Sequence, residues 1–446
     1  MHTAVRSFLL LSTPLGRLGR RGRDAVRSLG WMGSAQAIGV ATRLVSNLIL
    51  TRLLVPESFA LIGTALAVLA MLEWLSDLGL QPAVIRHPDG ERDRVVSTAW
   101  WIGLIRGLVL TGLAAAAAAP LAAFYASPGL TGVLVLIGLK PLLMSLRSPG
   151  YPLLRRRMDY RRLFFDELVQ IVGGTAVTLG LAWWWRSADA IAAGIVAGGV
   201  LSTLLSYLLA PRRLTRPNRQ AAVELLRFSG PVFFNTLAMA LWLNLDRLLG
   251  LKLLPADQVG LYMLAFNLAA AAEALVVRGC DVYFSSLARV DDLDRDRWHA
   301  KQTARLVRYA MPAAAAAALV SPLAVTLLYD DRYHAAGPLL AILMTRLMIR
   351  AFGQMRFQNL LACGRVGSAT IAYLVAFALQ AGTIQPLVAA AGLEGLAVSA
   401  LLGTLAMTVV QEFLSTKRNR SEMRSLAYTV GWSAASLLLV GAGLWS

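Results

Sequence analysis

Charged residues are scarce in this chain. Asp, Glu, Lys and Arg together make up 15% of its 446 residues, whereas soluble domains contain about 25%. Hydrophobic residues make up 57%, and the mean hydropathy is +0.60. Apolar stretches of about 20 residues recur along almost the whole length, and each can cross a hydrocarbon core of about 30 Å. Because these stretches are continuous rather than alternating, we predict membrane-spanning helices, and the fold class is an all-α integral membrane protein.

Cysteine and histidine are also rare. The two cysteines, Cys280 and Cys363, lie inside or beside predicted helices, which excludes a disulfide framework and a CxxC metal site. The four histidines are scattered and argue against a zinc cluster. The outer connections are only a few residues long, and no nucleophile–base constellation stands out. We therefore predict no metal, no organic cofactor and no catalytic residue, with coupling to H⁺ or Na⁺ left open.

Positive charge is abundant but unevenly placed. The formal net charge is +18, yet the arginines lie between apolar spans rather than in one stripe, so we predict no nucleic-acid partner. The basic loops alternate with loops that carry little beyond Arg186 and Arg332. The positive-inside rule therefore predicts a multi-pass membrane protein with a cytoplasmic N-terminus. Contact of these loops with anionic membrane lipids is a further, ordinary explanation of the same arginines.

The apolar blocks predict about thirteen spans in two halves. We place them at about 30–53, 59–80, 96–124, 130–149, 164–185 and 189–210, then at 228–252, 259–285, 303–328, 335–361, 368–391 and 393–414, and finally at 425–445. The implied units are a basic cytoplasmic tail (1–29), an N-terminal six-helix lobe (30–210), a cytoplasmic linker (211–227), a C-terminal six-helix lobe (228–414), and a loop with an extra helix (415–446).

Internal similarity supports two parallel halves. The segment from Arg52 to Phe59 is echoed by Lys252 to Val259, and alanine runs at 114–119 and 313–318 each precede a Pro-Leu-Ala triplet. Several such matches occur in the same order at an offset of about 200. Transporters built from parallel repeats place the substrate path at the interface between the halves.

Ionisable residues inside the predicted spans are the candidate site. Each costs at least about 2.5–3.5 kcal/mol at the centre of a span, so it is expected to face a partner or a watery cavity. The candidate substrate-binding residues are Arg43, Asn47, Arg106, Lys140, Arg147, Arg278, Arg346 and Arg350. The acids, which could be coupling sites or counter-ions, are Glu73, Asp77, Asp246 and Glu273. The cations outnumber the acids, and guanidinium groups match phosphate oxygens in a bidentate way. This predicts a cationic cavity for a diphosphate, with internal ion pairing as the alternative.

Four motifs resemble one known family. Arg43, Asn47 and the segment Arg52–Ala60, followed by the segment Asp77–Arg86, are similar to the opening of the oligosaccharide flippase (polysaccharide transporter, Wzx-like) family. The segments 148–162 and 255–262 resemble its cytoplasmic loop after the fourth helix and the second-half counterpart of the opening motif. The similarity runs over nearly the whole chain from about Leu29.

The resemblance implies a transporter of the multidrug/oligosaccharidyl-lipid/polysaccharide exporter superfamily, located in a bacterial inner membrane. Its two lobes would form a V that alternates between inward-open and outward-open states. The cargo would be an undecaprenyl-diphosphate-linked repeat unit for exopolysaccharide, capsule or O-antigen, and possible partners are a polysaccharide polymerase and glycosyltransferases. In this mechanism Arg43, Lys140, Arg346 and Arg350 receive the head group while the polyprenyl tail stays in lipid, and the lobes rock about the linker.

Two other functions stay open. A cation-coupled multidrug antiporter would share the fold, but its cavity would be expected to be rich in acids rather than arginines. A membrane-embedded polysaccharide polymerase, ligase or acyltransferase would be expected to place its chemistry in a sizeable outer loop or on a His/Asp pair.

Overall fold

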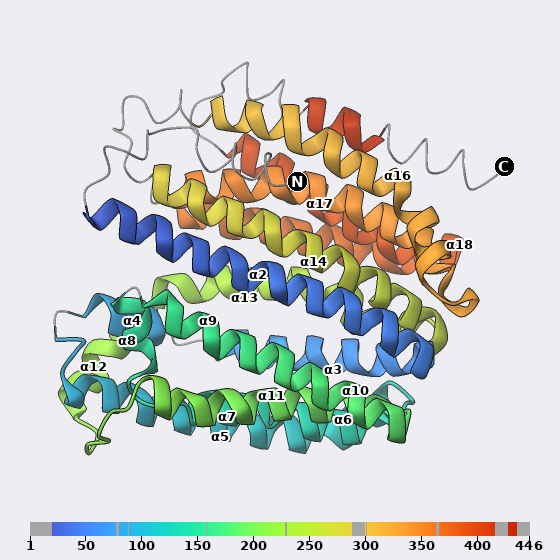
Figure 1. Cartoon of the computed structure of the whole chain (residues 1–446). Coiled ribbons are helices and arrows are strands. Elements are labelled where there is room, and N and C mark those ends of the chain that lie inside the picture. The colour runs from blue at the N-terminus through green and yellow to red at the C-terminus, as the bar shows by residue number, and fades with distance from the viewer. Residues whose placement is uncertain are drawn as a thin grey trace.

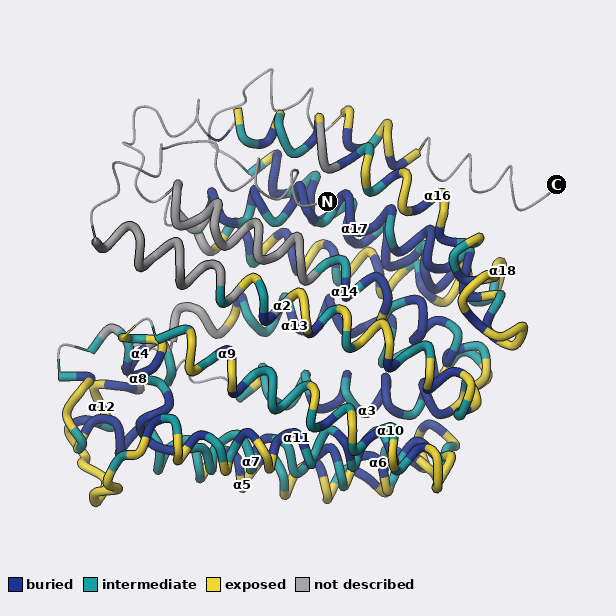
Figure 2. Tube along the Cα trace, in the orientation of Figure 1, coloured by how far each residue is buried: buried dark blue, intermediate teal, exposed yellow. Residues whose placement is uncertain are grey.

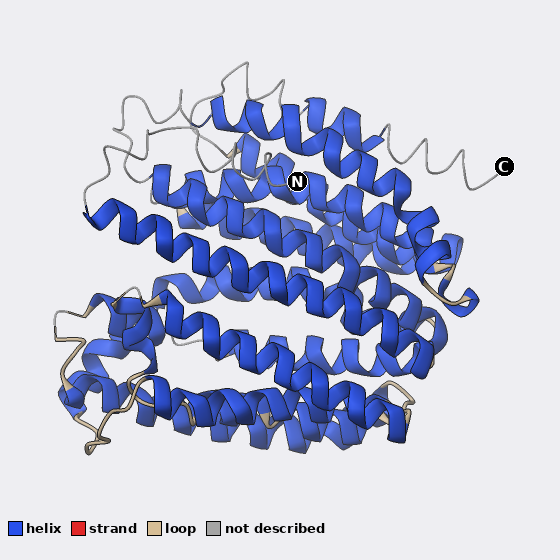
Figure 3. Ribbon diagram, viewed as in Figure 1, coloured by secondary structure: helices blue, strands red, loops and turns tan. Residues whose placement is uncertain are grey.

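The computed structural model is built entirely from helices in the part of the chain that it describes. That part comprises residues 20–76, 80–87, 89–157, 159–227, 230–287, 299, 301–362, 365–414 and 427–434. No strand occurs among these residues (Figure 3). The prediction of an all-α protein is confirmed.

The N-terminal lobe follows the predicted order of spans. It contains α2 (Arg20–Leu53), α3 (Pro56–Leu75), α4 (Leu80–Arg86), α5 (Asp93–Phe124), α6 (Leu130–Ile137), α7 (Lys140–Ser145), α8 (Tyr151–Arg156), α9 (Tyr160–Leu168), the π-helix η2 (Val169–Gly173), α10 (Gly174–Trp185) and α11 (Ala188–Leu209). The fourth predicted span breaks between α6 and α7, where Pro141 occupies the first turn of α7. Proline suits that position because the N–H it lacks has no partner in the first turn of a helix.

The C-terminal lobe repeats this plan. It contains α13 (Gly230–Leu253), α14 (Ala256–Leu287), η3 (Leu306–Ala310), α16 (Met311–Leu328), η4 (Asp331–Tyr333), α17 (Ala336–Ala362) and α18 (Val366–Phe413). The last of these holds two predicted spans, because Ala391 and Gly392 are not helical and Gly392 has a φ of +53°. The chain folds back at this turn, which brings Gln380 on the first arm beside Gly403 on the second.

Seven helices or helix runs are long and apolar enough to cross a membrane within the described residues: 56–75, 93–124, 160–185, 188–209, 301–328, 336–360 and 367–413. The other predicted spans of the two lobes coincide with α2, α6–α7, α13 and α14. Eight helical residues, 427–434, are described in the thirteenth predicted span. The chain is thus a multi-pass membrane protein, and the total of thirteen spans stays a prediction.

The two lobes lie side by side with α2 and α3 between them (Figure 1). Helix α3 packs against both α13 and α14, so the second helix of one lobe contacts the first two helices of the other. Outward-facing side chains such as Trp184, Leu208 and Leu327 are at least 74% exposed, and such residues mark the outer helices in Figure 2. An apolar outer surface is what a bilayer requires of these helices.

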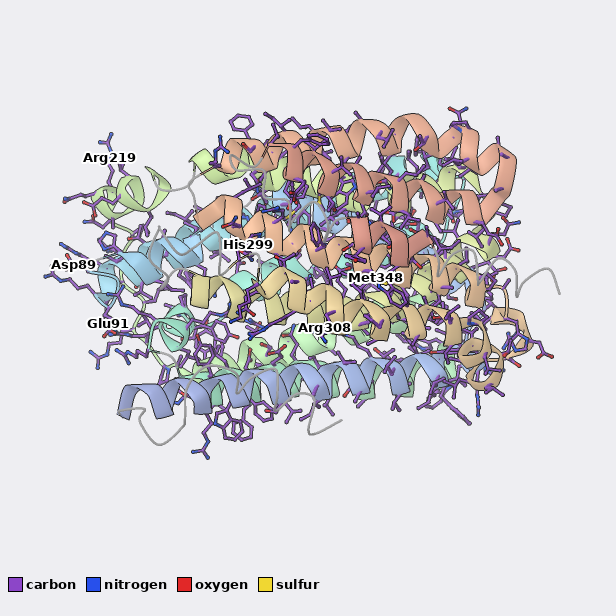
Figure 4. All side chains as sticks on the ribbon, turned by 90° about the horizontal axis from the view of Figure 1, so that it is seen from above. Asp89, Glu91, Arg219, His299, Arg308 and Met348 are labelled. Carbon is purple, nitrogen blue, oxygen red and sulfur yellow. The ribbon has the colours of Figure 1, made fainter. Side chains whose placement is uncertain are left out.

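The basic loops of the N-terminal lobe gather at one end of the molecule, which we call the basic end. Arg157 bonds Glu91 at 2.8 Å, and Arg212 bonds Asp93 at 2.6 Å. Figure 4 shows Asp89, Glu91 and Arg219 together at this end. The hydrogen bond from Arg157 lowers the pKa of Glu91 below its usual value.

The predicted linker packs on the N-terminal lobe at the basic end. The backbone N–H groups of Thr215 and Asn218 donate to Ser97 Oγ and Thr98 Oγ1 of α5 at 3.0 and 2.9 Å. Helix α12 (Arg219–Arg227) follows and buries Ala221 and Leu225 in the same cluster as residues of α4 and α5. Most of the predicted linker therefore belongs structurally to the first lobe.

The lobes are tied together at the opposite end. The Tyr333 hydroxyl donates to the carbonyl of Leu54 at 2.8 Å, and the Tyr125 hydroxyl donates to the carbonyl of Leu248 at 2.9 Å. Gly260 approaches Pro56 so closely that a Cβ on it would lie 1.8 Å from the Pro56 carbonyl oxygen. This end of the path between the lobes is therefore closed.

Candidate functional site

A cavity of about 500 Å³ opens inside the N-terminal lobe. Its wall is formed by α3, α4, α5, α7 and α8, so three of the predicted spans and the loops after them build one site. We call it the basic cavity, after its charged lining residues Glu73, Arg106, Lys140, Arg147 and Arg155.

Arg106 is fixed against the end of α3. Its Nη2 donates to the Glu73 carbonyl at 2.6 Å, and its Nε donates to Ser76 Oγ at 3.0 Å. The last carbonyls of a helix have no partner within the helix and carry partial negative charge, so a guanidinium is well placed there. No carboxylate among the described residues pairs with Arg106, so within that part of the chain its charge remains available to the cavity.

Lys140 is held by the break in the fourth span. The turn between α6 and α7 places it at the start of α7, where Nζ lies 3.5 Å from Glu73 Oε1. The two side chains are 29% and 27% exposed. The pair is loose and faces open space, so an incoming anion can compete with Glu73 for the ammonium group.

Arg147 is anchored deeper, by the fifth and sixth spans. It donates to Gln170 Oε1 at 3.0 Å and to Ser202 Oγ, and lies 3.5 Å from Asp166 Oδ2. Asp166 is 1% exposed and also accepts from Tyr151 and Ser202, each at 2.6 Å. Our sequence reasoning missed Asp166. Its position in the first turns of the fifth predicted span was the available signal.

The lining of the basic cavity is strongly positive. Among the described residues, four cations line it together with a single carboxylate, that of Glu73. Arg155 is exposed at the basic end and has no ion pair or hydrogen bond among the described residues. Such a set of guanidinium and ammonium groups binds phosphate-like anions. Within the described residues no cluster of His, Cys, Asp and Glu suits a metal ion.

The predicted residues on α2 do not line this cavity. Arg43 is exposed and its guanidinium has no partner in the described part of the chain. Asn47 is half-buried, and its backbone carbonyl accepts from Thr51. Arg278 lies on α14 where side chains are not described, and Asp77 lies outside the described residues. The roles predicted for these residues stay predictions.

The predicted cations of the C-terminal lobe are ion-paired. Arg346 Nη1 lies 3.4 Å from Asp246 Oδ2, and Arg350 Nη1 lies 2.7 Å from Glu273 Oε1. Asp246 also accepts from the Tyr262 hydroxyl. Internal pairing, the alternative raised from the sequence, therefore describes these four residues in this state of the protein.

Two further groups of this lobe were not predicted. Arg247 bonds Asn244 Oδ1 and lies over the ring of Phe266 at 4.5 Å. Arg356 donates to Glu412 and to the ring of His299, and all three are at most 3% exposed. Arg247 and Arg356 were not predicted, because each lies on a different face of its helix from the candidate residues that we chose there.

His299 serves as a neutral partner of Arg356. Burial and, to a smaller extent, the charge of Arg356 lower the pKa of this imidazole to about 3. The group is thus uncharged at physiological pH, and its Nε2 can accept the hydrogen bond from Arg356 at 3.0 Å.

The chain is similar in sequence to proteins of polysaccharide biosynthesis. A family model described as "Polysaccharide biosynthesis protein" matches residues 49–338. The lipopolysaccharide biosynthesis protein WzxC of Escherichia coli (strain K12) is 23% identical over 355 residues, which cover 75% of this chain and 69% of that protein. The succinoglycan biosynthesis transport protein ExoT of Rhizobium meliloti (strain 1021) is 26% identical over 212 residues, 46% of this chain and 42% of that protein.

Solved structures share the fold. The lipid II flippase MurJ in its inward closed conformation has a TM-score of 0.71 at 10% identity, with 92% of this chain and 95% of that chain covered. An inward-facing multidrug resistance MATE family transporter of the MOP superfamily has a TM-score of 0.69 at 15% identity, with 88% and 96% covered. The predicted two-lobe architecture and the resemblance to Wzx-like flippases are confirmed. The chain belongs to the family of polysaccharide biosynthesis proteins and has the MATE/MurJ fold of the MOP superfamily.

Proposed function

We propose that this protein is a flippase for lipid-linked oligosaccharides, and that the basic cavity receives the diphosphate of the cargo. The cargo is an undecaprenyl-diphosphate-linked repeat unit, moved from the cytoplasmic to the periplasmic leaflet of a bacterial inner membrane for exopolysaccharide, capsule or O-antigen synthesis. The observation that carries the proposal is the convergence of Arg106, Lys140, Arg147 and Arg155 on one cavity whose described lining contains a single carboxylate.

The names of the relatives support this class of cargo. WzxC is named a lipopolysaccharide biosynthesis protein, and ExoT is named a succinoglycan biosynthesis transport protein. MurJ, which shares the fold, is named a lipid II flippase. These names favour transport of a polysaccharide precursor over a polymerase, ligase or acyltransferase activity.

The charge of the basic cavity separates the two transporter hypotheses. A multidrug antiporter that takes up cationic drugs needs carboxylates to compensate their charge, because a cation in a low-dielectric site requires a counter-ion. Here Glu73 already lies beside Lys140, and three further cations line the same wall. This arrangement supports an anionic cargo.

The mechanism follows from the closed end and the placement of the cations. The diphosphate enters from the basic end, exchanges with Glu73 at Lys140, and is held by Arg106 and Arg155 while the polyprenyl chain stays in lipid. The contacts between Tyr333 and Leu54 and between Tyr125 and Leu248 then break as the lobes rock. The assignment of Arg346 and Arg350 as direct phosphate ligands is less favoured than the sequence suggested, because neither lines the basic cavity and each has an acid partner.

The N-terminus lies in the cytoplasm in this proposal, and the basic end faces the same side. A polymerase on the periplasmic side and glycosyltransferases on the cytoplasmic side are the partners that such a reaction sequence requires. Coupling to H⁺ or Na⁺ remains part of the proposal without an assigned residue.

Reconstitution into liposomes tests the function. Purified protein is placed in vesicles that contain undecaprenyl diphosphate linked to a radiolabelled oligosaccharide, and flipping is followed by accessibility of the sugar to an external glycosidase. We expect wild-type protein to expose the cargo. We expect Lys140→Met to slow flipping at least tenfold, because about 1.4 kcal/mol of lost phosphate binding corresponds to one factor of ten.

Arg161→Met is the matched control, because Arg161 is exposed at the basic end and does not line the cavity. It should flip cargo at the wild-type rate. Flipping by Lys140→Met at the wild-type rate would refute the phosphate site, and absence of flipping by wild-type protein would refute the cargo.

A further inference from the structure

The C-terminal lobe contains polar groups that are buried without partners. Among the described residues, Trp242 Nε1, both polar atoms of Gln380, and Arg346 Nη2 have no hydrogen-bond partner. Trp242 and Gln380 are 1% and 0% exposed, and Arg346 is 5% exposed. We call these three residues the Trp242 cluster.

The unpartnered atoms of the Trp242 cluster lie close together. A Cβ placed on Gly403 would be 3.0 Å from both Trp242 Nε1 and Gln380 Oε1. The neighbouring residue, Thr404, accepts from Arg346 Nε at 3.0 Å, and the Arg346 guanidinium carbon lies 5.9 Å from the Trp242 ring centroid. The helices α13, α17 and α18 thus bring three polar side chains to one place.

Burying these polar atoms costs free energy unless a ligand forms hydrogen bonds with them. Each buried donor or acceptor left unsatisfied costs about 1–3 kcal/mol, and the cost is higher in a membrane interior, where water is scarce. Four such atoms in one cluster are therefore a strong reason to expect a ligand with hydrogen-bonding groups in part of the transport cycle.

The chemistry of the Trp242 cluster favours a neutral, hydroxyl-rich ligand. It presents three donors and one acceptor, and the charge of Arg346 is already compensated by Asp246. A phosphate can only accept hydrogen bonds, so it would leave the Gln380 carbonyl unsatisfied. A sugar hydroxyl both donates and accepts. The adjacent Trp242 and Tyr373 rings, stacked 5.6 Å apart and at most 2% exposed, would offer an apolar surface to a sugar ring once the lobes separate.

Trp74 separates the Trp242 cluster from the basic cavity. It lines the cavity on the N-terminal lobe, and it packs against the hydrophobic cluster that contains Trp242 and Tyr373. A sugar attached to a diphosphate in the cavity would thus be next to the cluster once Trp74 moves aside. Trp74 lies near the basic end of α3, far along that helix from the closed contact at Pro56.

We propose that the Trp242 cluster is a saccharide subsite, which binds the sugar next to the diphosphate when the lobes separate at the basic end. This inference rests on the proposed function and adds a division of labour to it. The N-terminal lobe holds the phosphates, and the C-terminal lobe recognises the hydroxyl groups of the sugar.

Two conservative variants and two ligands test the subsite. Trp242→Phe removes the indole N–H and keeps an aromatic ring. Gln380→Met removes the amide nitrogen and oxygen at nearly constant side-chain volume. Binding to protein in nanodiscs is measured for undecaprenyl diphosphate and for the same lipid carrying one hexose, with glucose, galactose and N-acetylglucosamine tried in turn. Thermal melting of the cargo-free protein is measured in parallel.

We expect each variant to bind the best hexose-bearing lipid about three- to tenfold more weakly, the range of one or two hydrogen bonds, and to bind undecaprenyl diphosphate normally. We also expect Gln380→Met to melt at a higher temperature than wild type, because it removes an unsatisfied buried amide. A merely structural glutamine would give neither the ligand selectivity nor the gain in stability.

Several results would overturn the subsite. If Gln380→Met raises the melting temperature but leaves hexose-lipid binding unchanged, the unpartnered polar atoms of the Trp242 cluster bind ordered water only. If both lipids lose affinity equally, the cluster is not selective for sugar. Lys140→Met serves as the comparison, since it should weaken both lipids; if wild-type protein binds neither lipid, the proposed function fails together with the subsite.

Discussion

The two lobes contain corresponding ion pairs that lie in different surroundings. Glu73 and Glu273 stand 200 residues apart at corresponding places in the second helix of each lobe, and each pairs with a cation on the fourth helix, Lys140 or Arg350. In the N-terminal lobe the pair lines a cavity with three more cations. In the C-terminal lobe it lies near a second pair, Arg346 and Asp246, and both arginines lie over Trp242.

The difference shows how a repeated fold can divide a binding task. A surplus of exposed cations in a cavity attracts an anion, whereas cations that already have acids beside them mainly organise their surroundings. The matched cations differ less in side-chain exposure, with 29% for Lys140 and 20% for Arg350, whereas the neighbouring Arg346 is only 6% exposed. The duplicated ancestor of such lobes need only change the neighbours of one pair to separate the two roles.

The largest expected effect comes from breaking the buried pair of the C-terminal lobe. Asp246→Asn leaves Arg346 buried without a counter-ion, which should destabilise the protein by about 3–5 kcal/mol. Thermal melting in detergent measures the loss. The double variant Asp246→Asn/Arg346→Met should recover most of it, because the buried arginine that lost its counter-ion is then removed as well.

The corresponding change in the N-terminal lobe is the control. Glu73→Gln should shift stability by no more than about 1 kcal/mol, because Lys140 keeps access to water in the cavity. Equal losses for Asp246→Asn and Glu73→Gln would contradict the contrast between the lobes.

A second prediction concerns the close contact between Gly260 and Pro56, where the two lobes meet at the end away from the basic loops. Gly260→Ala places a methyl group 1.8 Å from the Pro56 carbonyl oxygen, and no side chain can move to relieve this backbone contact. We expect the end away from the basic loops to open and flipping to fall at least tenfold. Labelling of Ser58→Cys by a membrane-impermeant maleimide, with Cys280 and Cys363 replaced by serine, measures the opening.

Gly382→Ala is the matched control for this contact, because a Cβ on Gly382 meets nothing within 4 Å. Its labelling and flipping should equal those of wild type. Unchanged labelling of the Gly260→Ala variant would show that the contact does not hold this end closed.

A third prediction, with the smallest effect on the protein itself, sharpens the role of the basic cavity. Gly103 lines the cavity and Gly112 lies exposed on the same helix, and a Cβ on either meets nothing within 4 Å. Gly103→Leu should fill part of the cavity and slow flipping about tenfold. Gly112→Leu should not, and neither variant should melt below wild type, since leucine favours a helix over glycine. Equal flipping by both variants would remove the cavity from the cargo path.

The sequence predicted the helical elements with good accuracy because the bilayer imposes a strong, local constraint. Each apolar block had to become a helix, although the fourth predicted span breaks between α6 and α7 at Pro141. The offset of about 200 between motifs predicted the two parallel lobes. The family was also recognisable, since its motifs are distributed along nearly the whole chain.

The partners of the charged residues were not predictable in the same way. The cost of burying charge told us that Arg147 and Arg346 needed partners, but not which ones. Asp166 was missed although it binds Arg147, and Glu412 was missed although it binds Arg356. A helical stripe fixes which residues share a face, whereas the neighbour of that face depends on how the helices pack.

The sequence by itself thus determined the all-helical membrane fold, the two repeated lobes, the family, and the need for compensated charge inside the membrane. These follow from hydrophobicity and repeat spacing, which act along the chain. Only the tertiary structure decided that Arg106, Lys140, Arg147 and Arg155 share a cavity in one lobe while Arg346 and Arg350 meet acids in the other. That outcome depends on the rotation and contact of helices far apart in sequence, because a charge in low dielectric responds to whichever group is within a few ångströms.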